Sequence, residues 1–337
     1  MKYAPIAIAT LNRDKHLEKC LDALVSNRHF KETKIYISVD YPPNEKYEEG
    51  YEKVKQLLMQ KYGKYENINI IYHEKNLGPI ENYAFIKDKI FCDLDYENII
   101  ILEDDSEVSK NFLDYCNKLL ECYENDSEIV GICGSSQTWY EENFKEKDTR
   151  NIDDRLRKMP MVWHGYATWK KDYYMLKELC NNNYFQNIRY NIKKLIKLHK
   201  KSRYFFYRYI ENICWKREEI PWYKGKIVPI DYIWGLYMMV DDKYMIFPTI
   251  NKVRDWGMDG SGKNFKEKSK YCNDISGMYL DEKDQYTKIE LDPYIDYSEI
   301  KKYDSYSDYR LKKVRFKAII KLCLSYFKYP EKGRNEK

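Results

Sequence analysis

The chain has 337 residues, 43% of them hydrophobic, and a formal net charge of +5. This length suits about two domains, or one large α/β domain with additions, and the apolar content excludes general disorder. The longest aliphatic run, Ile99 to Leu102, is far shorter than the ~20 residues of a membrane-spanning helix. Because Met1 leads straight into a strand-like segment without a signal peptide, we expect a cytoplasmic protein.

Nine cysteines are scattered without a Cys-x-x-Cys pair, so neither a zinc site nor a disulfide framework is indicated. The small positive net charge does not by itself indicate a nucleic-acid partner. We therefore expect reduced thiols and no nucleic acid.

Residues 1–135 alternate between apolar runs and amphipathic stretches, which predicts strands that alternate with helices. Strands are expected at 3–10, 34–39, 68–72, 99–102 and 129–133, and helices at 16–25, 45–62, from 79, and 109–123, where Ser109 provides a cap. Repeated β-α units predict an α/β fold with a mainly parallel sheet, and ligands of such sheets bind at the carboxyl ends of the strands.

The second half is less regular. Helices are expected at 170–180, 187–217 and 231–239, a strand at 244–247, a glycine-rich loop at 257–262, and a basic amphipathic helix at 312–329. We expect a catalytic domain over 1–265, with halves 1–135 and 136–265 and a helical insertion at 185–217. A helical, basic extension is expected over 266–337.

Three acidic residues, Glu103, Asp104 and Asp105, directly follow the apolar run that ends at Leu102. Three adjacent carboxylates are costly to bury, so we expect them to point into the ligand crevice. There they would suit a hard divalent cation that bridges a diphosphate. The alternative is that they are solvated acids at the start of the next helix.

The segment from Ile99 to Tyr115 resembles the metal-binding segment of GT-A glycosyltransferases, which have a Rossmann-like α/β fold. It is most similar to the branch with N-acetylglucosaminyltransferase I and many bacterial polysaccharide enzymes, where the segment reads Glu-Asp-Asp-x-Glu-Val. The resemblance implies that Asp105 binds Mn²⁺ or Mg²⁺ directly, and that Glu103 and Asp104 face the sugar nucleotide.

Earlier segments resemble the nucleotide-binding parts of the same family. The first strand and loop, Ile6 to Arg13, imply nucleotide contacts from Thr10 and Arg13, and Asp40 matches an acid that hydrogen-bonds uracil. Asn82, in the helix after an Asn-x-Gly turn, is also expected to contact the nucleotide sugar. The alternatives are that Arg13 is an ordinary surface arginine and that Asp40 is an aspartate in a turn.

Three later segments also resemble the family. The segment Trp163 to Trp169 resembles Gly-Trp-Ala-Thr-Trp, which implies that Trp169 lines the sugar site; a core aromatic cluster is the alternative. Asp231 matches an aspartate that acts as catalytic base, with a helix N-cap as the alternative.

The loop from Asn251 to Gly262 resembles Asn-x-Gly-x-Asp-Gly-Ser-Gly, which implies that Gly260 and Ser261 close over the diphosphate. A merely flexible turn is the alternative. Family members often place a His just beyond this loop, but Asn264 stands near that position, so this motif offers no His ligand.

Basic residues accompany aromatic ones in residues 188–217 and in the expected terminal helix. Such helices can lie on anionic lipid, but they can equally be solvated faces packed on the catalytic domain. Single-stranded nucleic acid also suits this composition, although no recognisable binding motif supports it.

Together these segments predict a metal-dependent, inverting transferase that moves a sugar, UDP-GlcNAc being the best donor, to a hydroxyl of a surface polysaccharide or lipid-linked glycan. A lipid-linked acceptor would place the protein at the inner face of the plasma membrane. The alternatives are a sugar-nucleotide pyrophosphorylase, which the glycine-free segment from Ala9 to Arg13 disfavours, and a non-catalytic peripheral membrane protein of the same fold.

Overall fold

The computed structural model describes residues 3–135, 156–162, 164–213, 230–248, 250–257, 259–261, 280, 282, 320, 322 and 323. Most of the predicted extension 266–337 and of its helix 312–329 therefore lies outside the described residues. Contacts divide the chain into two compact units. The first comprises 1–158, 163–171 and 245–292, and the second comprises 159–162, 172–244 and 293–337.

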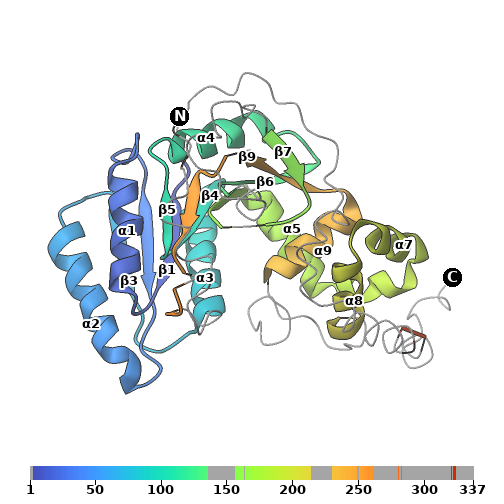
Figure 1. Cartoon of the computed structure of the whole chain (residues 1–337), viewed down its shortest axis with the longest axis horizontal. Helices are drawn as coiled ribbons and strands as arrows, with labels where there is room; N and C mark the ends of the chain where they lie inside the picture. The colour runs from blue at the N-terminus through green and yellow to red at the C-terminus, as the bar shows by residue number, and fades with distance from the viewer. Residues whose placement is uncertain are drawn as a thin grey trace. The chain divides into compact units, whose positions relative to one another are not determined.

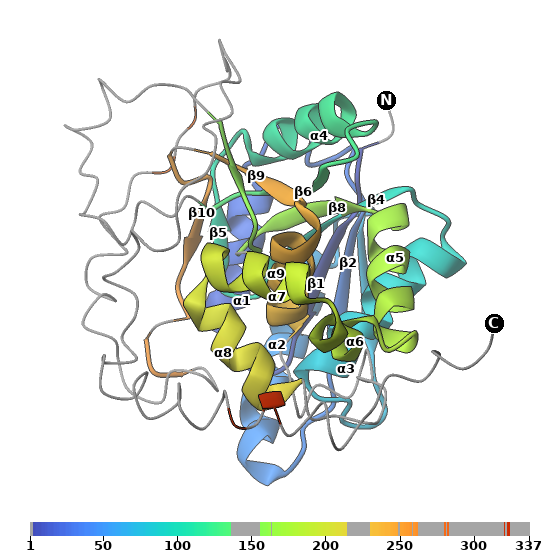
Figure 2. The same cartoon turned by 90° about the vertical axis from the view of Figure 1, so that its right-hand side faces the viewer.

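The first unit contains an eight-stranded sheet in the order β3-β2-β1-β4-β8-β6-β9-β7. In this order the strands are β3 (Ile68–Tyr72), β2 (Ile35–Val39), β1 (Ile6–Thr10), β4 (Asn98–Glu103), β8 (Tyr166–Trp169), β6 (Ile129–Cys133), β9 (Tyr244–Pro248) and β7 (Leu156–Met159). The pairs β3-β2, β2-β1 and β1-β4 are parallel, whereas β8 runs antiparallel to both β4 and β6. Figure 2 shows β1, β2 and β4 side by side. The predicted α/β fold with a mainly parallel sheet is confirmed.

The inner strands form because their residues are apolar on both faces, as expected when a sheet is covered on both sides. Every residue of β1, β2 and β6 is buried, and so are Ile99 to Leu102 in β4. In contrast, β3 stands at the edge of the sheet and is only half-buried.

Three α-helices connect the parallel strands (Figure 1): α1 (Asp14–Val25), α2 (Glu48–Leu57) and α3 (Pro79–Asp88). A fourth, α4 (Phe112–Tyr123), follows β5 and leads to β6. The expected helix 45–62 begins as a 3₁₀ turn and ends as a π turn. Pro79 starts α3 after Gly78, whose φ of 80° suits glycine. α3 packs on β1 and β2, and α4 packs on β6 and β8.

A small second sheet was not expected. Ser106–Val108 form β5, which pairs antiparallel with β10 (Val253–Asp255). For this reason α4 begins three residues later than the predicted cap at Ser109. The pairing brings the loop after β10 to the residues that follow β4.

The second unit is helical, with most of α5 (Lys170–Asn181), then α6 (Tyr184–Asn187), α7 (Ile192–Lys201), α8 (Arg203–Asn212) and α9 (Ile230–Asp241). The stretch 187–217, for which a helical period was expected, contains separate helices, and its residues 214–217 lie outside the described residues. Asn191 caps α7 by accepting from the Lys194 amide, and Ser202 is extended and caps α8 by accepting from the Phe205 amide. None of the helices in the described part of the chain combines the length and hydropathy needed to cross a bilayer.

Candidate functional site

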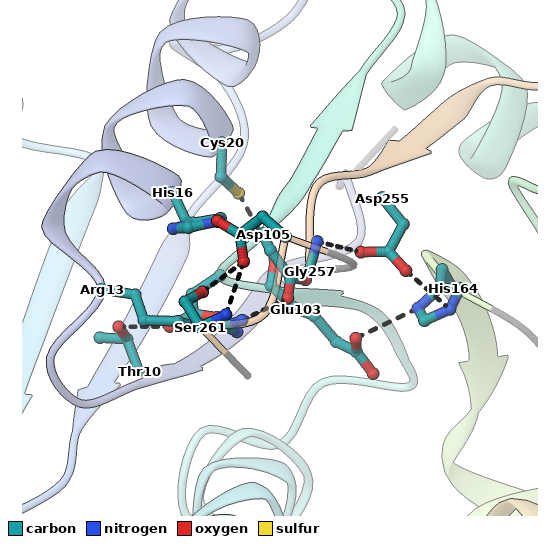
Figure 3. Close-up of polar contacts among 12 residues, drawn as sticks. Thr10, Arg13, His16, Cys20, Glu103, Asp105, His164, Asp255, Gly257 and Ser261 are labelled. Carbon is teal, nitrogen blue, oxygen red and sulfur yellow. Dashed lines mark hydrogen bonds and ion pairs between the residues drawn. The ribbon is translucent and has the colours of Figure 1, made fainter. Parts of the chain in front are cut away.

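The predicted nucleotide and metal residues of β1 and β4 meet at the carboxyl ends of these strands. Register places Ala9 opposite Glu103, so Thr10 lies beside Asp104 and donates a 2.8 Å hydrogen bond to its Oδ2. The Arg13 guanidinium pairs with the other oxygen of Asp104 and lies 2.7 Å from Asp105 Oδ2. Figure 3 shows Arg13 reaching toward the carboxylate of Asp105. Arg13 is thus charge-paired with the acidic cluster.

Asp105 stands out electrostatically. It is 5% exposed, and its Oδ1 is buried without a hydrogen-bond partner among the residues that the structure describes. Burial raises the pKa of Asp105 to about 8, and the neighbouring charge of Asp104 adds to this, against the opposing effect of Arg13. A carboxylate in this state gains strongly from a cation.

These features fit a divalent cation held by Asp105, because the free carboxylate oxygen is the hard ligand that Mn²⁺ or Mg²⁺ prefers. Within the described residues, no group of three or more His, Cys, Asp or Glu side chains forms a metal cluster by itself. Asp105 is therefore suited to act as a single protein ligand whose cation also needs oxygens from a bound donor or water. The residue Asn264, where the family often has a His, lies outside the described residues.

The loop after β10 packs directly on Asp105. The backbone amide of Trp256 donates a 2.9 Å hydrogen bond to the Asp105 carbonyl. A Cβ at Gly257 would lie 2.3 Å from Asp105 Oδ2, so only glycine fits beside this carboxylate. The amide of Gly257 in turn donates a 2.7 Å hydrogen bond to Asp255 Oδ1. This close approach explains one glycine of the predicted loop.

The predicted loop residues Gly260 and Ser261 lie at the edge of the same cluster. Ser261 donates to Asp259 Oδ1 from its amide at 2.9 Å and from its hydroxyl at 2.6 Å. The other Asp259 oxygen is 2.9 Å from His16 Nε2 on α1. Gly260 has a φ of 91°, which favours glycine. The loop is thus attached to α1 one turn beyond Arg13, and contact with a diphosphate stays a prediction.

His164 also belongs to the site, although the sequence does not single it out as a candidate. Its Nδ1 lies 3.1 Å from Glu103 Oε2 and its Nε2 lies 3.2 Å from Asp255 Oδ2. Burial alone would lower the pKa of His164, but Glu103 and Asp255 outweigh it and raise the pKa to about 10. No local motif signals this role, since it depends on the antiparallel pairing of β8 with β4.

The structure does not support the prediction that Trp169 lines the sugar site. It is 3% exposed, and it lies opposite Asn98, at the start of β4. Five residues separate Asn98 from Glu103, or roughly 16 Å along a strand. Because β8 runs antiparallel to β4, the segment brings His164 to the carboxylates and carries Trp169 away from them. Trp169 belongs to the core, the alternative reading of this segment.

The side chains of Asp40 and Asn82 form hydrogen bonds with other groups of the protein. The Asp40 carboxylate accepts from the amides of Tyr41, Leu77 and Gly78 at 2.8–2.9 Å and from Asn76 Nδ2 at 3.2 Å. These four donors fill the acceptor positions of a carboxylate, so the contacts of Asp40 do not support uracil recognition.

Asn82 is buried, and its amide group donates to the carbonyl of Ser38 and accepts from the Ser38 hydroxyl. It ties α3 to β2. The expected contact of Asn82 with a nucleotide sugar is thus not supported either.

Asp231 belongs to the helical second unit. It is the second residue of α9 and is exposed. It therefore lies inside the first turn, one position beyond the start of the helix, where its charge complements the helix dipole. Its expected role as base stays a prediction.

Comparison with known proteins provides evidence that is independent of the geometry of the site. Residues 1–155 match the model of the GNT-I family, that of N-acetylglucosaminyltransferase I. This match supports a GT-A-like glycosyltransferase. It covers the part of the chain that carries the acidic triplet, whereas the resemblance expected from the sequence extended to about residue 265.

Among solved structures, the chain is similar to S. aureus TarS, with 16% identity, a TM-score of 0.30, and coverage of 39% of this chain. The chain spans 21% of the length of TarS. No curated protein matches the chain.

Proposed function

We propose that this chain is a metal-dependent, inverting glycosyltransferase that moves a sugar from a UDP-sugar to a glycan hydroxyl. The GNT-I match supports the reaction class. The observation that supports metal dependence is the buried, unpartnered Oδ1 of Asp105 at the carboxyl end of β4. UDP-GlcNAc is the proposed donor because the matching family acts as an N-acetylglucosaminyltransferase.

A divalent cation at Asp105 would neutralise negative charge on the diphosphate as it leaves. The chain's own residues prepare this site. Thr10 and Arg13 fix the carboxylate of Asp104 beside it, and the Gly257 turn brings backbone close to Asp105. Arg13 is placed to exchange part of its ion pairing for donor oxygens, which a guanidinium binds well.

Asp231 is the proposed base. An inverting transfer requires a carboxylate that accepts the proton of the acceptor hydroxyl as its oxygen attacks the anomeric carbon. The exposed position of Asp231 in the first turn of α9 leaves it accessible to solvent. We propose that Gly260 and Ser261 close over the donor and exclude water.

The acceptor is proposed to be a surface polysaccharide or a lipid-linked glycan, made in the cytoplasm, with a lipid-linked acceptor at the inner face of the plasma membrane. Peripheral contact with anionic lipid is part of this proposal. The basic helix 312–329 that would make it lies mostly outside the described residues.

Release of UDP from a panel of UDP-sugars, measured with Mn²⁺ and with a chelator, tests the proposal. Metal-dependent release from one donor, abolished in Asp105→Ala, supports a transferase. Release of a sugar phosphate and UTP on addition of pyrophosphate would favour the pyrophosphorylase, and donor binding without turnover would favour the non-catalytic protein.

The base is tested separately. Asp231→Asn is expected to lower kcat at least about 100-fold while UDP affinity stays the same, because base catalysis contributes typically that much. Glu178→Gln, on α5 of the same unit, serves as control. Equal kcat values for the parent and Asp231→Asn would exclude Asp231 as base.

A further inference from the structure

The imidazole ring of His164 lies between two carboxylates that belong to different segments (Figure 3). Glu103 Oε2 is hydrogen-bonded to its Nδ1 at 3.1 Å, and Asp255 Oδ2 forms an ion pair with its Nε2 at 3.2 Å. Because a carboxylate only accepts, both ring nitrogens must donate, and the ring is an imidazolium. The geometry therefore makes His164 a two-ended cationic donor.

The two carboxylates lie on different strands and have different surroundings. Glu103 ends β4 immediately before Asp104 and Asp105, and its side chain is 47% exposed. Asp255 ends β10, and its other oxygen accepts from the Gly257 amide. His164 thus connects an exposed acceptor beside the metal-ligand position with the turn that packs on Asp105.

The position of His164 is itself fixed by backbone. Its carbonyl accepts a 3.1 Å hydrogen bond from the Ser135 hydroxyl, at the end of β6. The next residue, Gly165, has a φ of 62°, and a Cβ there would lie 2.6 Å from Val253 Cγ2 on β10. The chain therefore turns tightly just before β8 and presents the ring toward the ends of β4 and β10.

We propose that His164 is a positioning residue of the donor site, which orients Glu103 toward the hydroxyl groups of the donor sugar and holds the Gly257 turn against Asp105. This inference rests on the proposed function, since it assumes a sugar-nucleotide donor. A fixed carboxylate accepts hydrogen bonds from sugar hydroxyls in a defined direction, so His164 contributes to discrimination among donor sugars and not to binding of UDP itself.

Two substitutions by amide side chains test the contacts at the two ring nitrogens separately. In His164→Asn the side-chain amide nitrogen falls near the position of Nδ1 and can still donate to Glu103. In His164→Gln it falls near Nε2 and can still donate to Asp255. His29→Asn is the matched control, because His29 also pairs with a carboxylate, Asp114, at 3.1 Å. The φ of 61° at His29 suits asparagine, and the residue lies far from the carboxyl ends of the strands, before β2.

Two measurements are made on each full-length variant: calorimetric affinity for UDP and for the UDP-sugar with Mn²⁺, and amide hydrogen exchange at Gly257 without ligand. His164→Gln should lose about tenfold of UDP-sugar affinity, as expected for one charge-assisted hydrogen bond, with UDP affinity changed less than about twofold. His164→Asn should keep the UDP-sugar affinity within about threefold and speed exchange at Gly257 about tenfold.

A merely structural role predicts a different outcome. If both His164 variants only lower the free energy of unfolding, as His29→Asn does, and leave both measurements at the parent values, the inference is wrong while the proposed function stands. If the parent binds neither UDP nor any UDP-sugar, the proposed function fails and this inference fails with it.

Discussion

Replacing Asp105 with asparagine should stabilise the metal-free protein at high pH. The carboxylate is buried, lies beside Asp104, and has one oxygen without a partner. Asparagine keeps the shape but carries no charge to desolvate. The same change removes the proposed metal ligand, so stability and function should move in opposite directions.

The pH dependence follows from the raised pKa, which is about 8 in the fold against an ordinary value of 3.8. Below about pH 4 the carboxyl is protonated in both the folded and the unfolded state, and its contribution to the free energy of unfolding is fully present. As the pH rises to about 8, only the unfolded chain ionises, so the parent loses stability. At about 1.4 kcal/mol per pKa unit the shift corresponds to a loss of several kcal/mol in the free energy of unfolding at about pH 8, with the opposing effect of Arg13 already included in the raised pKa.

Urea unfolding in the presence of a chelator, measured from about pH 4 to about pH 8, tests this prediction. The advantage of Asp105→Asn over the parent should be near zero at the acidic end and grow as the pH rises. Asp93→Asn, at an exposed carboxylate that pairs with Lys89, is the control and should show no such growth. An Asp105→Asn variant that is equally stable or less stable at about pH 8 would refute the electrostatic reasoning.

Three further substitutions test the surrounding geometry. Gly257→Ala should lower the free energy of unfolding by about 1–3 kcal/mol and weaken Mn²⁺-assisted UDP binding in calorimetry, because its Cβ would meet the Asp105 carboxylate; unchanged UDP affinity would place the turn away from the donor. Trp169→Phe should cost about 1–3 kcal/mol in urea unfolding with UDP-sugar affinity unchanged, and a selective loss of affinity would return Trp169 to the sugar site. Asp40→Asn should cost about 1–3 kcal/mol and speed amide exchange at Gly78, whereas reduced UDP affinity at unchanged stability would support the uracil contact.

The sheet was largely predictable because its inner strands are continuous apolar runs. The segments at 35–39, 68–72 and 129–133 coincide with the predicted strands within a residue. The helix break at Ser202 was not predictable from periodicity, because basic and aromatic residues continue on both sides of it. A single hydroxyl that caps α8 decides where one helix ends and the next begins.

The residues of the candidate site also differ in how far the sequence predicts their positions. Thr10, Arg13, Asp104 and Asp105 come together because β1 and β4 pair in parallel and end at one edge of the sheet. The sequence predicts the parallel sheet and its ligand edge, but not which strands are neighbours. Trp169 was expected at the sugar site, but His164 of the same segment lies at the carboxylates instead, since both positions depend on the direction of β8. Strand direction after a long connection is set by tertiary packing, which no local motif encodes.

Calorimetric titration of UDP into the full-length protein tests the central claim most directly. Asp105 is proposed to bind a divalent cation that assists diphosphate binding, so UDP affinity should rise at least about tenfold when Mn²⁺ replaces chelator, and Asp105→Asn should abolish that rise. Equal UDP affinity with and without the cation, or a cation effect that survives in Asp105→Asn, would contradict the account.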